Sequence, residues 1–496
     1  MSLFATKSVE RILAESEDSE HSLKRTLGAF ALVALGIGAV IGAGIFTISG
    51  KAAADHAGPA IVISFIVAAI GCGFAGLCYS EFATMIPIAG SAYTYAYATM
   101  GELLAWIIGW DLVLEYAIGA ATVSVGWSGH VMDLLGRAGI FLPPRLAASP
   151  FEMVRAADGT MVHGIANFPA VLIIVLISFV LVAGIKESAT VNSVIVVLKV
   201  AVVVVFIAIG WAFINPANLH PFIPQNTGVW GHFGWSGILR GSGVIFFAYI
   251  GFDAVSTAAQ ETKNPQRNMP IGIIGSLIIC TILFILYSYV LTGVVNYKVF
   301  QDPRYYAAPI TAALAMMPYS FLGVAMDLAI IAGLTSVILV MLLGQSRVFY
   351  SMSRDGLLPR VFSDVHPKFR TPWRSNLLMM LFVGVFSAVV PIGVLGEMTS
   401  IGTLFAFVIV CGGIIVMRRT RPDVKRGFTT PLVPLVPILG IISNFLMIFS
   451  LGVDNWLRLI VWLLIGLGIY FGYSRYHSKL TLDASRNAAP LGSKSE

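Results

Sequence analysis

A lysine and two acidic residues stand inside long apolar stretches of the sequence and are the best candidates for binding protons. Lys199 lies in VNSVIVVLKVAVVVVF, roughly 15 Å into that stretch if it is helical. Asp111 and Glu115 are four residues apart in WIIGWDLVLEY, on one helix face. An ionisable group inside a membrane span is costly, so its default interpretation is functional. We expect Lys199, facing the protein interior, and Glu115 to exchange protons. A purely structural ion pair is the alternative for Lys199.

Two further stretches carry glycines near their middle. They are LGAFALVALGIGAVIGAGIFTISGKAAA (27–54) and ILRGSGVIFFAYIGFDAVSTAAQE (238–261). A matched pair of glycine-interrupted segments points to a transport site, although glycine also serves close helix packing. An unwound helix beginning near Gly44 would offer free N–H groups to a carboxylate. Helices ending near Ile41 and Ile250 would offer free carbonyls to an ammonium group. A zwitterionic α-amino acid satisfies both, whereas a sugar or an inorganic ion does not.

The remaining polar and aromatic candidates have weaker signals. Phe246 and Phe247 precede the second break, and at most one of the two adjacent rings points toward a substrate as a gate. Asp253 follows that break and is expected to tie it to neighbouring helices. Asp111 is interpreted as lying in a polar groove open to the cytosol. Two further acids near helix ends are interpreted as solvated or capping residues, namely Glu81 and Asp327.

The composition favours a membrane protein and argues against several other classes. Of the residues, 57% are hydrophobic and 11% are charged, against about 25% charged in soluble domains. The four cysteines lie in apolar runs without metal-ligand spacing, and the eight histidines form no HExxH pattern. We therefore expect no metal, no cofactor and no enzyme activity. The basic residues fall in loops between apolar runs, which argues against nucleic-acid binding.

The apolar runs predict an all-α membrane protein of about twelve spanning helices. The loop 136–163 is expected to be irregular, and residues 1–26 to form a cytoplasmic leader with a short amphipathic helix. The predicted spans are 27–53, 59–84, 102–135, 164–184, 190–213, 238–262, 270–296, 321–351, 373–393, 397–418, 434–452 and 455–474.

The distribution of Lys and Arg predicts the orientation. With twelve spans, the side that holds both termini carries 22 of the 31 Lys and Arg residues, and the opposite side carries 8. Basic residues concentrate on the cytoplasmic side of membrane proteins. We therefore expect a multi-pass protein of the cytoplasmic (inner) membrane with both termini in the cytoplasm.

Four long motifs resemble the amino acid–polyamine–organocation superfamily, and within it the bacterial relatives of the cationic amino acid transporters. The resemblance covers residues 24–475 and rests on GIGAVIGAGIF (36–46), EFATMIPIAGSAYTYAYATMGELLAWIIGWDLVLEY (81–116), FFAYIGFDAVSTAAQETKNPQRNMPIGI (246–273) and GQSRVFYSMSRDGLLP (344–359). It implies an inverted five-plus-five repeat with broken first and sixth helices and two extra helices. The implied divisions are 27–213 and 238–418 for the two halves, 434–474 for the extra helices and 475–496 for a cytoplasmic tail.

The resemblance also implies roles for individual residues. Gly42, Ala43 and Gly44 would meet the substrate carboxylate. The amino group would meet Ile41 and the backbone of Phe247, Ala248 and Ile250, and Phe247 would be the gate. Lys199 matches the lysine that replaces a sodium site in proton-coupled members, Glu115 matches an acidic position of this subgroup, and Gly119 would line the pocket.

The choice of substrate side chain rests on one position. Leu334 lies in IIAGLTSVILV, where a cationic substrate would need more room or a polar partner. We therefore expect proton-coupled symport of small neutral amino acids such as alanine. A transporter for arginine and lysine, an exchanger without proton coupling, and a non-transporting sensor are the alternatives. The sequence leaves open whether a small membrane subunit or a sterol-like lipid binds the helix bundle.

Overall fold

A computed structural model describes residues 5–7, 27–86, 91–155, 159–184, 189–480 and 482. Within these residues, eight apolar helical stretches are long enough to cross a membrane, and the stretch Ala29–Met85 covers two of the predicted spans. Three shorter apolar helices accompany them, at Phe168–Val182, Trp373–Val389 and Leu435–Ser450. The architecture is therefore the expected all-α membrane type, and the exact count of twelve spans stays a prediction. Most of the predicted leader and tail lies outside the described residues.

The helices follow the apolar runs closely. Those of the first half are α2 (Ala29–Val40), α3 (Ser49–Ala52), α4 (Ile61–Met85), α5 (Ser91–Thr99), α6 (Glu102–Val113), α7 (Gly119–Arg137), α8 (Phe168–Val182) and α9 (Ala189–Gly210). Those of the second half are α10 (Gly234–Ile245), α11 (Ala254–Thr257), α12 (Pro265–Val294), α13 (Pro309–Ala315), α14 (Ser320–Arg354), α15 (Trp373–Val389), α16 (Ile392–Thr420), α17 (Leu435–Ser450), α18 (Val453–Ile469) and α19 (Arg475–His477).

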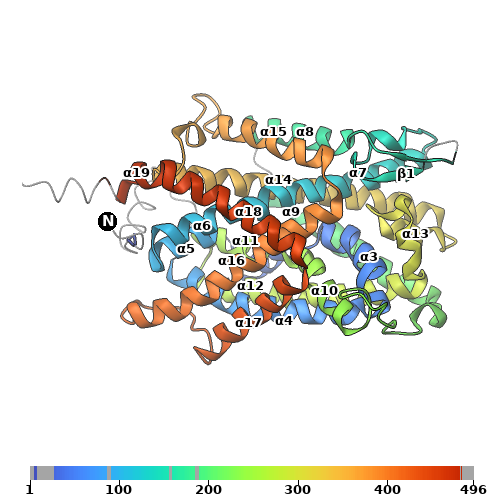
Figure 1. The fold of residues 1–496 in the computed structure, drawn as a ribbon, viewed down its shortest axis with the longest axis horizontal. Helices are drawn as coiled ribbons and strands as arrows, with labels where there is room; N and C mark the ends of the chain where they lie inside the picture. The colour runs from blue at the N-terminus through green and yellow to red at the C-terminus, as the bar shows by residue number, and fades with distance from the viewer. Residues whose placement is uncertain are drawn as a thin grey trace, which may run out of the picture.

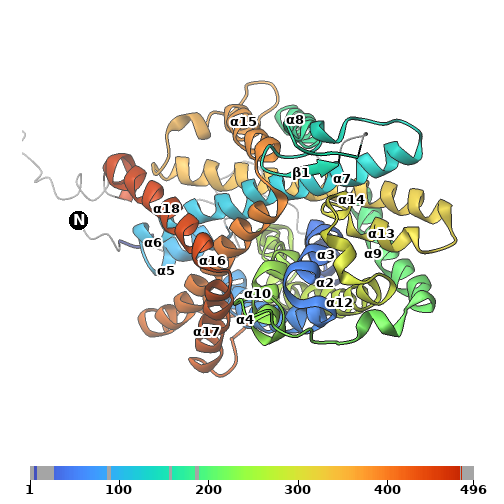
Figure 2. The same ribbon diagram turned by 45° about the vertical axis from the view of Figure 1, so that its right-hand side comes forward.

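The helices pack in two groups, which Figure 1 and Figure 2 show on opposite sides of the molecule. The bundle group consists of α2, α3, α4, α10, α11 and α12. The scaffold group consists of α6, α7, α8, α14 and α15, with α8 and α15 side by side in both views. Helices α9 and α16 contact members of both groups. A transport site between the groups would thus be enclosed by α9 and α16.

Three elements were missed by the hydropathy pattern. The short helices α5 and α13 are too short to be recognised as spans. The loop 136–163, expected to be irregular, contains an antiparallel hairpin of β1 (Met153–Arg155) and β2 (Met161–His163). Its strands have three residues each, which is too few for an alternating pattern to be recognisable.

Three acidic residues are more deeply buried than predicted. Glu81 is almost fully buried and accepts hydrogen bonds from Arg418, Arg426 and the Thr430 backbone, so the interpretation as a solvated residue is wrong. Asp327 is also fully buried, and its carboxylate lies 2.9 Å from Nδ1 of His130. Asp111 is 1% exposed, so it does not line an open groove in this closed structure. Burial of this kind depends on which helices pack together, which a single helix sequence does not encode.

Candidate substrate and proton site

The first glycine-rich stretch is broken near its middle, as predicted. Helix α2 ends at Val40, and Ile41 is extended (φ −73°, ψ 101°). Helical structure resumes at Ala43, which is followed by a π-helical turn, η1 (Gly44–Ile48). Among the described residues, the backbone N–H groups of Gly42 and Ala43 have no backbone acceptor. Unpaired N–H groups at the start of a helix are suited to bind a carboxylate.

The second stretch is broken at the matching place. Helix α10 passes into the 3₁₀ turn η8 (Phe246–Tyr249), and regular structure resumes only at Ala254. Gly251 has φ +114°, a backbone conformation that residues other than glycine rarely adopt. The carbonyls of Ala248, Tyr249 and Ile250 accept no backbone hydrogen bond within the described chain, whereas that of Phe247 accepts one from Ile250. Free carbonyls at a helix end are suited to bind an ammonium group.

The two breaks pack directly on each other in antiparallel fashion. A methyl group added at Gly44 would overlap the Cα of Ala248. A methyl group added at Gly251 would lie 2.9 Å from the carbonyl carbon and oxygen of Ala39. Glycine is therefore required at both positions for the backbones to approach. Free donors of one break and free acceptors of the other consequently lie within one small region.

Lys199 is bound to the first break. It is 1% exposed in α9, and its Nζ donates a 2.7 Å hydrogen bond to the carbonyl of Gly38. In an uninterrupted helix that carbonyl would accept from the N–H of Gly42, which the break has removed. The lysine thus satisfies one of the carbonyls freed by the break, and it links α9 to the last turn of α2.

Glu115 and Gly119 lie on the opposite wall. The long helix of α6 and α7 is interrupted by a π-helical turn, η4 (Leu114–Ile118), which carries the fully buried Glu115. Such π-bulges occur often at functional sites. Gly119 follows at once, and a methyl group there would lie 3.2 Å from Sδ of Met341 and 3.5 Å from Cγ2 of Thr399. Gly119 therefore lies between α14 and α16.

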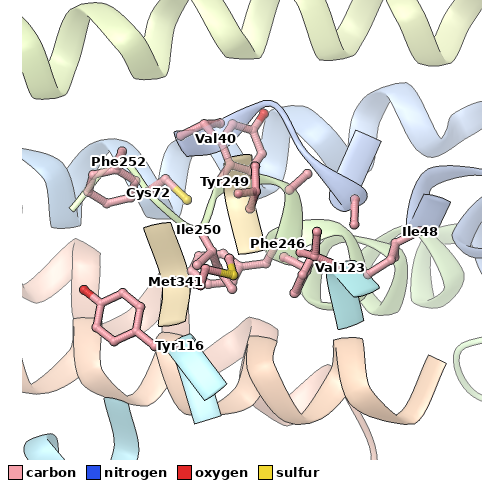
Figure 3. Close-up of a cluster of buried hydrophobic side chains, with 14 of the residues drawn as sticks. Val40, Ile48, Cys72, Tyr116, Val123, Phe246, Tyr249, Ile250, Phe252 and Met341 are labelled. Atoms are coloured by element: carbon pink, nitrogen blue, oxygen red, sulfur yellow. The ribbon is translucent and has the colours of Figure 1, made fainter. Parts of the chain in front are cut away.

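An apolar cluster occupies the space between these walls. Figure 3 shows Phe246, Ile250, Val123 and Met341 together in it. Phe246 packs edge-on against Phe407 of α16, with ring centroids 5.4 Å apart. The cluster contributes no charged group, so it suits an uncharged substrate side chain.

Two further predicted residues belong to the same buried core. Phe247 is 4% exposed, and Leu334 is fully buried in α14. The residues of α14 that approach Gly42 and Gly119 are Val337 and Met341, which sequence reasoning missed. Their spacing of three and seven from Leu334 is that of one helix face, and this periodicity was the available signal.

Ion pairs and stacked groups close the site on the side of α3. Lys51 pairs with Asp55 at 2.9 Å and lies over the ring of Tyr306. Glu397 of α16 accepts a 2.7 Å hydrogen bond from Asn455 and lies 3.7 Å from Arg240 of α10. Between these groups lies a cavity of only about 50 Å³, lined by Thr47, Ile48, Lys51, Asp55, Val244 and Glu397 among others. Nearby in the β-hairpin loop, burial raises the pKa of Glu152.

Backbone and side-chain contacts close the opposite side. The Leu27 N–H donates to the Glu261 carbonyl at 2.9 Å, and the Lys263 N–H donates to the Leu27 carbonyl at 2.8 Å. These bonds join the start of α2 to the end of the segment that follows α11. Lys7 and Tyr93 both donate to Asp355 at the end of α14. The structure is thus closed on both sides of the breaks.

The sequence model of a known family, described as amino acid permease, matches residues 27–472. This chain belongs to the amino acid permease family. The permease is 45% identical to the branched-chain amino acid permease BcaP of Bacillus subtilis, over 97% of this chain and 99% of that protein. It is 42% identical to the methylthioribose transporter of the same organism, with the same coverage. The vacuolar cationic amino acid transporter 4 of Arabidopsis thaliana is 30% identical, over 97% of this chain and 96% of that protein.

Membership of this family confirms the predicted resemblance and the class of transporter. The permease is a multi-pass membrane protein, and the breaks lie where the family resemblance places the substrate. The structure brings Gly42, Ala43 and Gly44 together with Ala248 and Ile250 at one junction, with Lys199 bound to the last turn before it. Glu115 and Gly119 lie across the apolar cluster from it, in the scaffold group.

Proposed function

We propose that this permease takes up neutral amino acids together with protons, by alternating access across the cytoplasmic membrane. The observation that carries the proposal is the junction of the two breaks. There the free N–H groups of Gly42 and Ala43 lie near the free carbonyls of Ala248 and Ile250. An α-carboxylate on the first and an α-ammonium on the second would satisfy every one of these groups. Residues 27–213 and 238–418 act in this proposal as inverted halves, with both termini in the cytoplasm.

The apolar cluster supports a neutral side chain. Val123, Ile250 and Met341 provide only hydrocarbon and a thioether to a side chain that enters between Gly119 and α14. The name of the Bacillus subtilis relative extends the range from alanine to branched-chain amino acids. A cationic side chain in contact with these hydrocarbon groups would lose its hydration, which is unfavourable. The cationic alternative is therefore second.

Lys199 supports proton coupling. Its amino group bonds the Gly38 carbonyl at the last turn of α2, so a change in its protonation acts directly on the substrate-binding break. In our proposal Phe247 closes over the bound substrate, and the segments on one side of the two breaks then move away from the scaffold group. Glu115 is the second proton-binding group of the proposal.

Uptake into proteoliposomes tests the substrate and the coupling together. Radiolabelled alanine, leucine, valine and arginine are offered singly, with and without an inward gradient of one pH unit. One coupled proton allows about tenfold accumulation under that gradient. Gradient-driven uptake of the neutral amino acids but not of arginine supports the proposal. Arginine uptake would identify a cationic transporter, and strong counterflow without a gradient effect would identify an exchanger.

A further inference from the structure

Three buried carboxyl groups lie close to one another around the break before α11, within stretches apolar enough to cross a membrane. Asp111 and Glu115 come from the α6–η4 helix of the scaffold group, and Asp253 comes from the break that precedes α11. None of the three is more than 1% exposed. Buried acids of this kind normally pair with a basic residue. Here, among the described residues, no lysine or arginine forms an ion pair with any of them.

The carboxyl oxygens lack ordinary donors. Within the described chain, both oxygens of Asp111, both of Glu115 and Oδ1 of Asp253 have no hydrogen-bond donor, and Oδ2 of Asp253 accepts from Tyr116 at 3.2 Å. Tyr116, which donates to Asp253, directly follows Glu115 in the chain, so the carboxyl groups of Glu115 and Asp253 lie in one buried site, where they interact with each other. Two carboxylates accept but do not donate, so this contact is favourable only when one of them is protonated. The hydrogen bond that a protonated carboxyl group donates to a carboxylate is short and strong.

Polar groups surround the pair, and no lysine or arginine of the described residues forms an ion pair with it. The Tyr79 hydroxyl of α4 lies near the two carboxyl groups and has no hydrogen-bond partner among the described residues. Thr403 of α16 is another neighbour of Glu115, but its hydroxyl donates to the Thr399 carbonyl. A methyl group added at Gly402 would lie 3.3 Å from Oδ1 of Asp111, so α16 also closes over that acid. The site is therefore suited to hold a proton and not a free carboxylate.

The pair crosses the boundary between parts that move separately in alternating access. Glu115 belongs to the scaffold group. Asp253 belongs to the segment that follows Gly251, whose far end is hydrogen-bonded to Leu27 through Glu261 and Lys263. Motion of that segment with α2 away from the scaffold would separate the two carboxyl groups. Water would then reach both, and the shared proton would no longer be held.

We propose that Asp253 and Glu115 share one transported proton. The pair exists only while α2 and the segment that follows Gly251 are closed on the scaffold group. Asp111 is the next proton acceptor. The inference rests on the proposed proton-coupled function and adds Asp253 and Asp111 to it. Asp253 is three residues from Ile250, whose free carbonyl is the proposed ammonium ligand. Substrate binding and proton release thus act on one short segment.

The test uses the full-length permease in proteoliposomes that contain a trapped pH dye. Leucine-driven proton entry and radiolabelled leucine entry are measured together under an inward gradient, and counterflow exchange is measured without a gradient. The variants are Asp253→Asn, Glu115→Gln, their combination and Asp111→Asn. Asp302→Asn is the matched control, because Asp302 lies outside the candidate membrane spans, with a partly exposed side chain that pairs with Arg304.

For Asp253→Asn we expect the ratio of protons to leucine to fall by about tenfold, a much larger loss than that of counterflow. The double variant is expected to be no worse than either single variant, because the two groups hold one proton between them. Asp253→Glu should restore part of the ratio. Asp111→Asn should slow proton entry without changing the ratio. Asp302→Asn should leave both rates unchanged.

The outcomes separate the inference from the proposed function. A wild-type protein without leucine-driven proton entry would refute proton coupling itself. If the wild type is coupled, two results would refute only the shared proton. One is an unchanged ratio of protons to leucine in Asp253→Asn, and the other is additive losses in the double variant. If Asp253→Asn does not fold, Tyr116→Phe replaces it. That change removes a donor to the Asp253 carboxylate and should move half-maximal uptake to higher pH by roughly half a unit to one unit. An unchanged pH profile would refute the inference.

Discussion

Replacement of Gly44 by alanine should impair substrate binding far more than the same replacement at Gly42. A methyl group at Gly44 would overlap the backbone of Ala248, so one of the two breaks would have to move. A methyl group at Gly42 would instead make ordinary contact with Cγ2 of Val337 at 3.4 Å. Neither glycine has a positive φ, so alanine at either position meets no conformational strain of its own. The pair therefore isolates the effect of backbone approach between the breaks.

The expected size follows from the cost of overpacking. Adding a methyl group to a closely packed site costs about 1–3 kcal/mol, and a backbone neighbour yields less than a side chain. If that strain acts on the bound state, the Kd rises by roughly five- to 150-fold for Gly44→Ala. For Gly42→Ala we expect a change below about threefold, because the Val337 side chain can turn.

Binding of radiolabelled leucine to purified protein measures both values. Thermal unfolding of the same samples verifies that each variant is folded. A Gly44→Ala protein that binds leucine as tightly as the wild type would show that close approach of the two breaks is not needed for binding. Equal losses in both variants would show that the effect comes from helix propensity and not from the contact with Ala248.

Four further changes test other parts of the site. Lys199→Met should abolish stimulation of uptake by a proton gradient, because it removes a charged donor to Gly38 worth about 1.5–3 kcal/mol; full gradient-driven uptake would contradict the coupling role. Phe247→Ala should raise the KM for leucine at least about tenfold, since a buried phenylalanine contributes roughly 3–5 kcal/mol, and unchanged uptake kinetics would exclude it as the gate. Met341→Ala should shift the ratio of leucine to alanine uptake toward the larger side chain by about tenfold, measured in competition; no shift would place the side-chain pocket elsewhere. Glu81→Gln should lower the free energy of unfolding by about 3 kcal/mol, seen as a lower Tm, because two arginines lose their buried partner; an unchanged Tm would show that the ion pairs contribute no net stability.

Much of the site was predictable because it is built from backbone. Glycines crowd the middle of the two broken stretches, and Lys199 stands alone in an apolar run, so both signals are local in the sequence. The helix propensity of glycine is low, and a lysine is expensive in a membrane, whatever surrounds them. These local facts led to the two predicted breaks, to the expected amino-acid substrate and to Lys199 as a proton-binding candidate, whereas the fold class came from the apolar runs.

Other features could not be read from any single helix. Three contacts join residues that are far apart in the sequence. They are the hydrogen bond of Lys199 to the Gly38 carbonyl, the approach of Met341 to Gly119, and the interaction of Glu115 with Asp253. The burial of Glu81 and Asp327 likewise depends on partners supplied by other helices.

The sequence by itself determined that the chain is an all-α membrane protein and where two of its helices break, because apolar length and glycine content act within one segment. Only the tertiary structure decided which freed carbonyl meets which cation and which two acids meet each other. Those contacts depend on how separate helices rotate and cross. When helix surfaces are uniformly apolar, their packing is specified by small residues and polar contacts, and these are spread over the whole chain.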